Sequence, residues 1–328
     1  MIRLTQIKLP ADHTPEALKK KIAKLLRIAP EEILELHIRK RSLDARKKPE
    51  LFYSYTVDVS ASREKELLHK GKNPQISLCK EEHYHFPEAG EERLRERPLI
   101  IGTGPAGLFC GLMLARHGYR PILLERGSSV EERQKKVNAF WQGGTLDVQF
   151  GEGGAGTFSD GKLNTLVKDP LKRGQLVLEL FTEFGADPSI LYDHKPHIGT
   201  DVLAEVVKAM RQEIIRLGGT VRFDTQVTDL LVEQQNVSGV KVSFADSQTG
   251  VQTEETIKSS IVVLAIGHSA RDTFSMLLSR QVPMEEKAFA VGLRIQHPQN
   301  MINLSQYGRE DAGALGAANY KLTRQTKS

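Results

Sequence analysis

Apolar and polar residues in the first sixty positions follow two different periods, which predict strands and one helix. Within Thr14–Leu26 apolar residues recur at every third or fourth position, and Pro15 stands in the first turn, so this segment predicts a helix. Strict alternation over Leu51–Val59 predicts a strand that buries one face. Further strands are expected over Ile2–Leu9 and Glu35–Arg41. The segment therefore predicts a small α+β module with the order βαββ.

From Pro98 onward the pattern is that of an α/β domain. Residues 126–165 are rich in glycine and predict irregular structure. A helix is expected to begin at Thr200 and to end before Gly218. The expected strands are Pro98–Ile101, Tyr119–Glu125, Thr220–Asp224, Val227–Val232, Val237–Phe244, Thr253–Lys258 and Ile261–Ile266. The last of these is a continuous apolar run, which is typical of a strand buried on both faces.

Composition divides the chain into three parts. Residues 81–97 are charged and poor in large apolar side chains, so we expect them to form a linker. Residues 1–80 then form the small module, and residues 98–328 form a Rossmann-type domain with the start of a substrate domain. The length of 328 residues agrees with about two domains of ~100–200 residues each.

A dinucleotide-binding fingerprint opens the larger domain. An apolar run leads into the G-x-G-x-x-G motif of Gly102–Gly107, and Glu125 ends the next apolar run. Gly102 allows a tight turn out of the strand, and Gly104 lets the backbone approach a pyrophosphate. Gly107 lets the following helix pack against the sheet.

The helix after this motif has the features of a phosphate site. Pro105 and Ala106 stand in its first turn, where free N–H groups and the helix dipole attract anions. Glu125 can accept hydrogen bonds from ribose hydroxyls, and its charge disfavours a 2′-phosphate. The sequence therefore predicts a nucleotide site.

The positive charge lies entirely in the N-terminal part. Residues 1–97 carry 21 Lys and Arg against 16 Asp and Glu, an excess equal to the whole formal net charge of +5. The excess is concentrated at Arg39–Arg41 and Arg46–Lys48. Such a patch can attract nucleic acid, but a solvated strand edge protected by charge is the favoured interpretation, because aromatic residues are not interleaved.

Other features bear on the compartment and on metal chemistry. No stretch offers the ~18 uninterrupted apolar residues of a membrane span, and the N-terminus lacks a signal-peptide pattern. Cys79 and Cys110 form no Cys-x-x-Cys pair, which disfavours dithiol chemistry and suits a reducing compartment. We therefore expect a cytoplasmic protein. The histidines show no metal-ligand spacing, and no metal is expected.

Three later features favour FAD over NAD as the bound nucleotide. The strands of residues 227–258 form a β-meander instead of further βα units. The returning strand ends in Ala265-Ile266-Gly267, which is similar to the Ala-Thr-Gly of two-dinucleotide-domain flavoproteins. A second glycine-rich loop offers backbone N–H groups for an anion and room for a flat ring. Its candidate residues are Gly153, Gly154, Gly156, Thr157 and Ser159.

Several long motifs resemble a bacterial family of uncharacterised FAD-dependent dehydrogenases, usually described as NAD(P)/FAD-dependent oxidoreductases. The motifs are Ser42–Lys48, Val130–Arg133, Val148–Leu163, Lys195–Asp201 and Leu264–Thr273. The resemblance implies a glutathione-reductase-like Rossmann architecture. It also implies that Arg126 and Arg133 approach the adenine or pyrophosphate, and that Val227 contacts the adenine through its backbone. Members of this family close the FAD site with a later glycine-rich segment, so the chain is expected to be C-terminally truncated.

The expected function is that of an FAD-dependent oxidoreductase that transfers hydride between the flavin and an unknown substrate or NAD(P)H. No catalytic residue is assigned. The alternatives are an RNA-linked flavoprotein or cofactor-binding module that uses the basic N-terminal part, and an inactive truncated fragment. The expected cofactor-binding residues are Gly102, Gly104, Pro105, Ala106, Gly107, Glu125, Arg126, Arg133, Gly153, Gly154, Gly156, Thr157, Ser159, Val227, Ala265 and Gly267.

Overall fold

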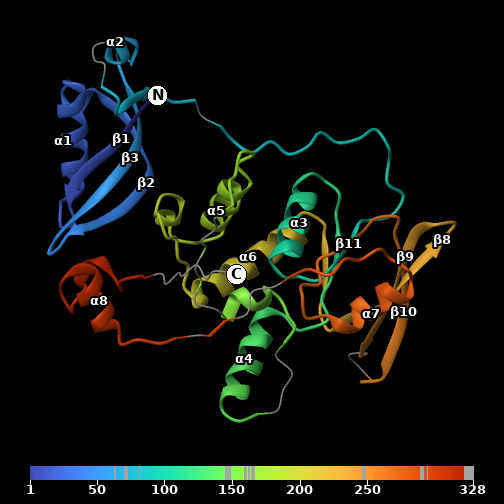
Figure 1. The fold of residues 1–328 in the computed structure, drawn as a ribbon. Coiled ribbons are helices and arrows are strands. Elements are labelled where there is room, and N and C mark those ends of the chain that lie inside the picture. Colours follow the sequence, from blue (N-terminus) through green and yellow to red (C-terminus); the bar gives the residue numbers. More distant parts are fainter. Residues whose placement is uncertain are drawn as a thin grey trace. The chain divides into compact units, whose positions relative to one another are not determined.

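The computed structural model describes residues 1–62, 64–69, 73–80, 82–144, 149–158, 161, 163, 167–245, 249–288, 292–293 and 295–320. The chain forms two compact units (Figure 1). Unit 1 comprises Met1–Tyr84, Pro188–Pro196 and Ala288–Ser328, and unit 2 comprises His85–Asp187 and His197–Lys287. The domain boundaries expected from composition stay a prediction. They differ from this division because they assign residues 188–196 and 288–328 to the larger domain.

Unit 1 contains an antiparallel sheet with the strand order β2-β3-β1-β4. Its elements are β1 (Ile2–Pro10), α1 (Pro15–Leu26), η1 (Pro30–Glu32), β2 (Ile33–Lys47), β3 (Glu50–Ala61), α2 (Glu64–His69) and β4 (Ile76–Leu78). Leu18 and Ile22 of α1 are buried in one core with Leu4, Val57 and Val59 of the sheet. The alternation of β3 thus buries one face against α1, as the sequence pattern indicates.

One acidic residue of β3, Asp58, is buried. Asp58 has no exposed side-chain area, and it accepts hydrogen bonds from Arg3 at 2.7 and 2.8 Å and from Arg39 at 2.6 Å. Burial by itself raises the pKa of this carboxyl, but the hydrogen bonds from the two arginines outweigh it and hold the pKa at about 2. The two guanidinium groups therefore stabilise a charge that β3 carries into the sheet.

Arg41 of β2 binds the returning segment 188–196 within unit 1. Its backbone N–H donates to Tyr192 O at 2.7 Å, and its guanidinium donates to both oxygens of Asp193 at 2.7 and 2.9 Å. The same guanidinium lies over the rings of Tyr53 and Tyr192. One side chain thus makes a bidentate ion pair and two cation–π contacts, the combination that arginine geometry allows.

A second, smaller core of unit 1 joins residues far apart in the sequence. Ile302 and Tyr307 of α8 (Gln299–Tyr307) pack with Leu51 of β3 and with Ala312 and Ala318. The short helices η3 (Pro188–Leu191) and η4 (Gly313–Leu315) also belong to this unit.

Unit 2 is built on a parallel sheet with the order β11-β5-β6-β7. Its elements up to the second glycine loop are β5 (Leu99–Ile101), α3 (Pro105–Arg116), β6 (Ile122–Leu124), α4 (Val130–Trp141) and η2 (Gly154–Phe158). Those that follow are α5 (Arg173–Glu183), α6 (Thr200–Arg216), β7 (Thr220–Arg222), β8 (Thr225–Glu233), β9 (Asn236–Ala245), β10 (Gln252–Lys258), β11 (Val262–Leu264) and α7 (Arg271–Ser279).

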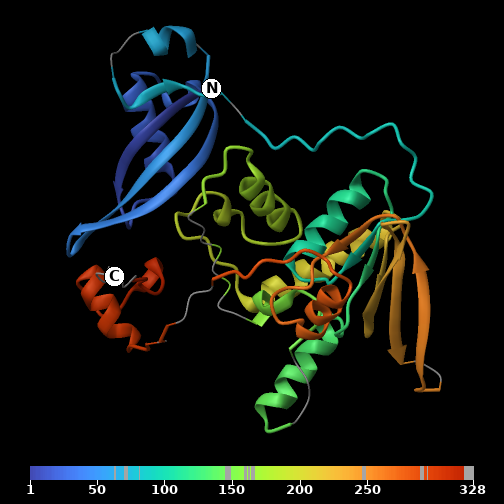
Figure 2. The ribbon, with the colours of Figure 1, turned by 45° about the vertical axis from the view of Figure 1, so that its right-hand side comes forward.

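The parallel sheet has a different layer on each face. Leu99 and Ile101 pack with Val240 and Val242 of the antiparallel sheet β10-β9-β8. On the opposite face Leu123 touches Gly111 of α3, and α3 packs against α6. Figures 1 and 2 show β8–β10 on one side of this unit and α3 and α6 on the other. The mixed α/β fold and the meander expected from the sequence are both present.

Two local expectations are wrong. Residues 126–165 were expected to be irregular, but α4 occupies Val130–Trp141, because Ser129 accepts a hydrogen bond from Glu132 N and acidic residues fill the first turn. The Ile261–Ile266 strand was expected to be buried on both faces. In the described part of the chain β11 is an edge strand, and the exposed fraction of Leu264 is 38%.

No helix within the described residues is both long enough and apolar enough to cross a membrane.

Replacement of Asp58 by asparagine should destabilise unit 1. Asp58→Asn leaves Arg3 and Arg39 without their carboxylate, and the loss of one partner from such a cluster costs about 3 kcal/mol or more. The measurement is denaturant unfolding of the whole chain near neutral pH. Asp12→Asn, which changes an exposed aspartate of the same unit, is the control and should unfold like the wild type.

The same carboxylate gives a pH dependence with a defined sign. Because the pKa of Asp58 in the folded chain, about 2, is below its unfolded value of about 3.9, its contribution is complete above pH ~4 and is lost as the pH falls toward ~2. Asp58→Asn should therefore lose less stability than the wild type over this acid range. An equal loss in both proteins would contradict the assignment.

Candidate cofactor site

The turn between β5 and α3 brings backbone against backbone. Gly102 has φ +97°, and a Cβ there would lie 2.5 Å from the carbonyl oxygen of Ala265. A Cβ at Gly107 would overlap the carbonyl oxygen of Gly102. These two glycines therefore fix the spacing of the turn, the helix and the end of β11, in agreement with the roles that the motif indicates.

The N-terminus of α3 is equipped for an anion. Gly104 is the N-cap and supplies no side-chain cap, Pro105 occupies the first turn, and the first turn holds no acidic residue. The first backbone bond of the helix runs from Leu108 N to Gly104 O at 3.0 Å. The N–H groups of Ala106 and Gly107 precede that bond, so they are available for a ligand.

Glu125 stands at the end of β6 with 4% of its surface exposed. Its Oε2 accepts hydrogen bonds from Thr103 N at 2.8 Å and from Thr103 Oγ1 at 2.9 Å, and its Oε1 accepts one from Gly127 N at 2.9 Å. A carboxylate has about four lone-pair sites. Glu125 is therefore held firmly in the turn and retains acceptor capacity for a hydroxyl group.

A cavity of about 680 Å³ lies at the carboxyl ends of β5, β6 and β11. In parallel α/β sheets ligands bind at this edge. Gly104 and Gly267 both line the cavity, and a Cβ at either position would meet no protein atom within 4 Å. The backbone is thus bare on the side that faces the cavity, which is the cradle that a bulky anionic ligand requires.

The second glycine-rich loop closes against the first. Gly153 N donates to Thr103 O at 2.9 Å, and a Cβ on Gly154 would lie 3.3 Å from Cδ of Pro105. Gly151, Gly153 and Gly154 have φ between +64° and +138°, a region that favours glycine. The loop therefore lies directly beside the N-terminus of α3.

A family model described as an FAD binding domain matches residues 97–281, more than half of the chain and nearly all of unit 2. The chain belongs to this FAD-binding-domain family. Residues 288–328 match the description "FAD-dependent protein, C-terminal domain-like", and residues 1–60 match a domain of unknown function. The expected resemblance to FAD-dependent bacterial proteins is thereby confirmed.

Individual relatives cover different shares of the chain. An uncharacterized protein of Clostridium beijerinckii is 43% identical over 331 residues, which span 99% of this chain and 60% of that protein. Thiamine thiazole synthase of Thermococcus kodakarensis is 26% identical over 198 residues, 58% of this chain and 66% of that protein. The crystal structure of THI4 from Thermovibrio ammonificans aligns with a TM-score of 0.40 and 18% identity over 57% of this chain and 63% of that one.

Two arginines of this FAD-binding domain differ in their surroundings. Arg126 lines the cavity, lies over the Phe150 ring at 4.0 Å, and donates to Asp272 at 2.9 Å, which lowers the pKa of that carboxyl. Arg133 is buried, and it donates to the carbonyls of Gly151, Glu152 and Gly154 at 3.4, 3.2 and 2.5 Å. Burial lowers the pKa of its guanidinium. Arg133 therefore stabilises the glycine loop through hydrogen bonds to the backbone carbonyls of that loop.

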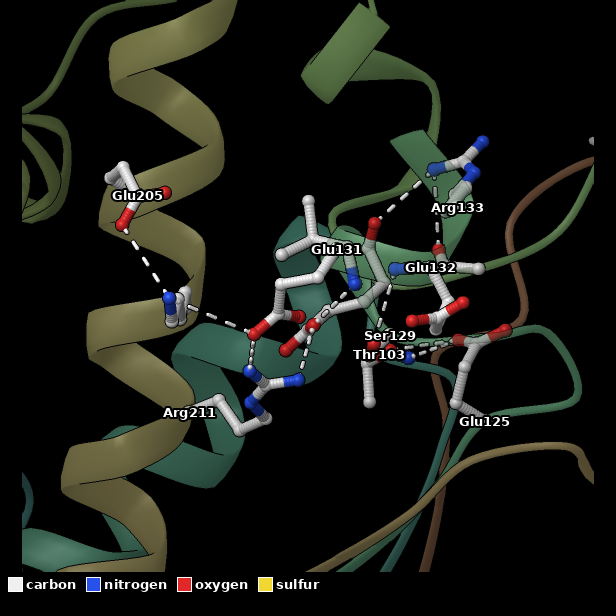
Figure 3. A network of polar contacts seen from close by, with 12 residues as sticks. Thr103, Glu125, Ser129, Glu131, Glu132, Arg133, Glu205 and Arg211 are labelled. Carbon is white, nitrogen blue, oxygen red and sulfur yellow. Dashed lines mark hydrogen bonds and ion pairs between the residues drawn. The ribbon is translucent and has the colours of Figure 1, made fainter. Parts of the chain in front are cut away.

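A buried carboxyl lies in the middle of that loop. Glu152 has no exposed surface, and its Oε2 accepts hydrogen bonds from Val130 N at 2.9 Å and from Arg211 of α6 at 3.0 Å. Burial raises its pKa to about 7. Figure 3 shows Arg211 reaching from α6 toward Glu131, to which it donates at 2.6 Å. Sequence reasoning missed Glu152, because a single glutamate among glycines gives no pattern.

The structure brings most of the predicted residues to one cavity. The predicted residues that line it are Gly102, Gly104, Pro105, Ala106, Glu125, Arg126, Gly154, Val227, Ala265 and Gly267. Gly107, Arg133, Gly153, Gly156 and Thr157 lie outside its lining. Ser159 lies outside the described residues. Phe150, Thr225, Phe274 and Leu277 also line the cavity but were not predicted. Only the amphipathic pattern of α7 could have indicated the last two.

Within the part of the chain that the structure describes, no group of three or more His, Cys, Asp or Glu side chains is placed to hold a metal ion. The Cys110 thiol of α3 has its pKa raised by burial, as is usual for an inert structural cysteine.

The two kinds of glycine in the fingerprint should respond differently to alanine. Gly107→Ala places a Cβ on the Gly102 carbonyl, so we expect a loss of several kcal/mol. Gly104→Ala meets open space at a negative φ and should change stability by less than about 1 kcal/mol without ligand. Thermal unfolding of both variants is the measurement. Equal destabilisation would contradict the assigned roles.

Proposed function

We propose that the protein is an FAD-dependent oxidoreductase whose cofactor lies extended in the cavity of unit 2. The observation that carries this proposal is the bare backbone of Gly104 and Gly267 at the carboxyl edge of the sheet, inside the segment that matches an FAD binding domain. The chain spans 60% of the length of the Clostridium relative, and the activity proposed is that of the whole protein.

The residues of the cavity fit the parts of FAD by charge and shape. The pyrophosphate would lie at the N-terminus of α3, where Ala106 and Gly107 offer N–H groups and no acidic side chain opposes it. Glu125 would accept a hydrogen bond from a ribose hydroxyl of the adenosine. Its negative charge would reject a 2′-phosphate at this position by repulsion.

The remaining lining residues would enclose the rings. Val227 and Arg126 line the cavity near Glu125 and would contact the adenine. Leu264, Phe274 and Leu277 supply an apolar wall from β11 and α7. We propose that Arg133 serves the pyrophosphate indirectly, because its guanidinium is occupied by the carbonyls of the loop.

The cofactor would supply the redox chemistry, and the chain would position the flavin ring. Bound FAD supplies hydride transfer at flavin N5. The glycine loop would orient the ring, and the apolar wall would exclude water from it. We propose NAD(P)H or an unidentified substrate as the hydride donor. Because the flavin would carry the redox chemistry, the reaction needs no nucleophilic side chain.

The basic N-terminal part supports this function better than an RNA-linked one. Arg39 pairs with Asp58, Arg41 with Asp193, and Arg46 with Asp44, so these charges are used inside unit 1. Three of the six cations at Arg39–Arg41 and Arg46–Lys48 are therefore paired with carboxylates. A cytoplasmic location remains our proposal from the two cysteines, which are both free thiols.

The purified chain should carry FAD or take it up. We expect a yellow protein with the visible absorption bands of oxidised flavin, and release of FAD on denaturation, identified by chromatography. Anaerobic bleaching by NADH or NADPH would then identify the donor. A colourless protein that ignores added FAD would contradict the proposal for this chain.

The variant Gly104→Val tests the site itself. A Cβ at this cavity-lining position meets no protein atom within 4 Å, so stability without FAD should be largely kept. FAD affinity should fall at least about tenfold, equivalent to about 1.4 kcal/mol. Titration of apoprotein with FAD is the measurement. Gly118→Val is unsuitable as a control because of its positive φ, whereas Gly90→Val, which also meets open space outside the cavity, should bind FAD like the wild type.

A further inference from the structure

Glu152 is a buried carboxyl that the proposed function leaves without a role. It belongs to the glycine loop whose neighbours Gly151 and Gly154 line the cavity. The next residue, Gly153, bonds to Thr103 of the fingerprint turn, and Gly154 lies against Pro105 at the start of α3. The carboxyl is therefore carried by the segment that touches the phosphate-binding turn.

The Glu152 side chain points away from the cavity into a network between two helices. Val130 N at the start of α4 and Arg211 of α6 both donate to Oε2. Oε1 is buried and accepts no hydrogen bond from the described residues. An ionised carboxylate in this position has no donor at Oε1 among the described residues, so burial penalises its charge.

The charges that face Glu152 act in opposite directions on its pKa. Arg211 attracts it, but Arg211 also binds Glu131 of α4 at 2.6 Å, and Lys208 of α6 is near Glu131 as well. Glu131 and Glu125 both oppose a second negative charge nearby. Arg133 of α4 donates to the backbone carbonyl of Glu152 and not to its carboxyl. Burial and these like charges raise the pKa of Glu152 to about 7.

We propose that Glu152 is a positioning residue that holds the glycine loop against the phosphate-binding turn in its protonated form, so that FAD binding takes up a proton. The inference rests on the proposed function. The two negative charges of the pyrophosphate would lie at the N-terminus of α3, which the loop contacts. They add to the negative potential at Glu152 and favour its neutral form further.

Thermodynamic linkage predicts the direction in which FAD affinity changes with pH. If FAD raises the proton affinity of Glu152, protonation of Glu152 must strengthen FAD binding by the same factor. FAD affinity should therefore be constant below pH ~6.5 and fall on the order of tenfold by pH ~8.5. Near pH ~7.5 binding should take up a fraction of one proton.

The test is calorimetric titration of the apoprotein with FAD in buffers of different ionisation enthalpy, together with affinities across this pH range. Glu152→Gln keeps the shape of the neutral carboxyl and cannot titrate, so it should bind FAD with the low-pH affinity throughout and take up no proton. Glu132→Gln is the control, because Glu132 is an exposed glutamate of α4 that lies outside the cavity lining. This variant should keep the pH dependence that Glu152 causes.

A second variant keeps the test decisive if Glu152→Gln does not fold. Glu131→Gln removes a like charge and leaves Arg211 to Glu152, so the fall in affinity should move to lower pH. An unchanged midpoint in Glu131→Gln, or a pH dependence that survives in Glu152→Gln or vanishes in Glu132→Gln, would overturn the assignment. Absence of FAD binding in every protein at every pH would instead refute the proposed function.

Discussion

Backbone meets backbone at the start of α3, and this contact leaves no room for a side chain at Gly102 or Gly107. The close approach sets where the helix begins and where β11 ends, and it places the first turn of α3 at the cavity. Thr103 lies inside the same turn and is fixed by Glu125 from β6 and by Gly153 from the second loop. Three separate segments of unit 2 therefore depend on one steric constraint.

Two buried ionisable side chains hold the second glycine-rich loop in place. Gly151 and Gly154 of this loop line the cavity. The loop is held by Arg133, which donates to its backbone carbonyls, and by the Glu152 carboxyl, which accepts from Val130 N. Both groups are buried, so each is costly unless hydrogen-bonded. The arrangement separates two tasks: Gly151 and Gly154 expose backbone to the cavity, while the ionisable side chain of Glu152 is bonded to groups of α4 and α6. A titratable group is thereby coupled to the shape of a cofactor site.

Unit 1 shows why a count of charges does not describe a surface. The excess of positive charge in residues 1–97 suggested a polyanion as one partner. In the folded unit Asp58 forms ion pairs with Arg3 and Arg39. Asp193, which lies far along the chain, forms an ion pair with Arg41. The carboxylate that neutralises Arg41 lies outside the segment that was counted, and only folding brings the two together.

The sequence by itself determined the fingerprint turn, the meander and the FAD class of unit 2, because these depend on local steric rules and on the period of apolar residues. Most of the residues that it predicted for the site line the cavity. Only the tertiary structure decided that Ile261–Ile266 lies at a sheet edge, that Arg133 serves the loop, and that Glu152 is buried beside Arg211. Burial and pairing depend on segments distant in the chain, and spacing along the sequence carries no record of them.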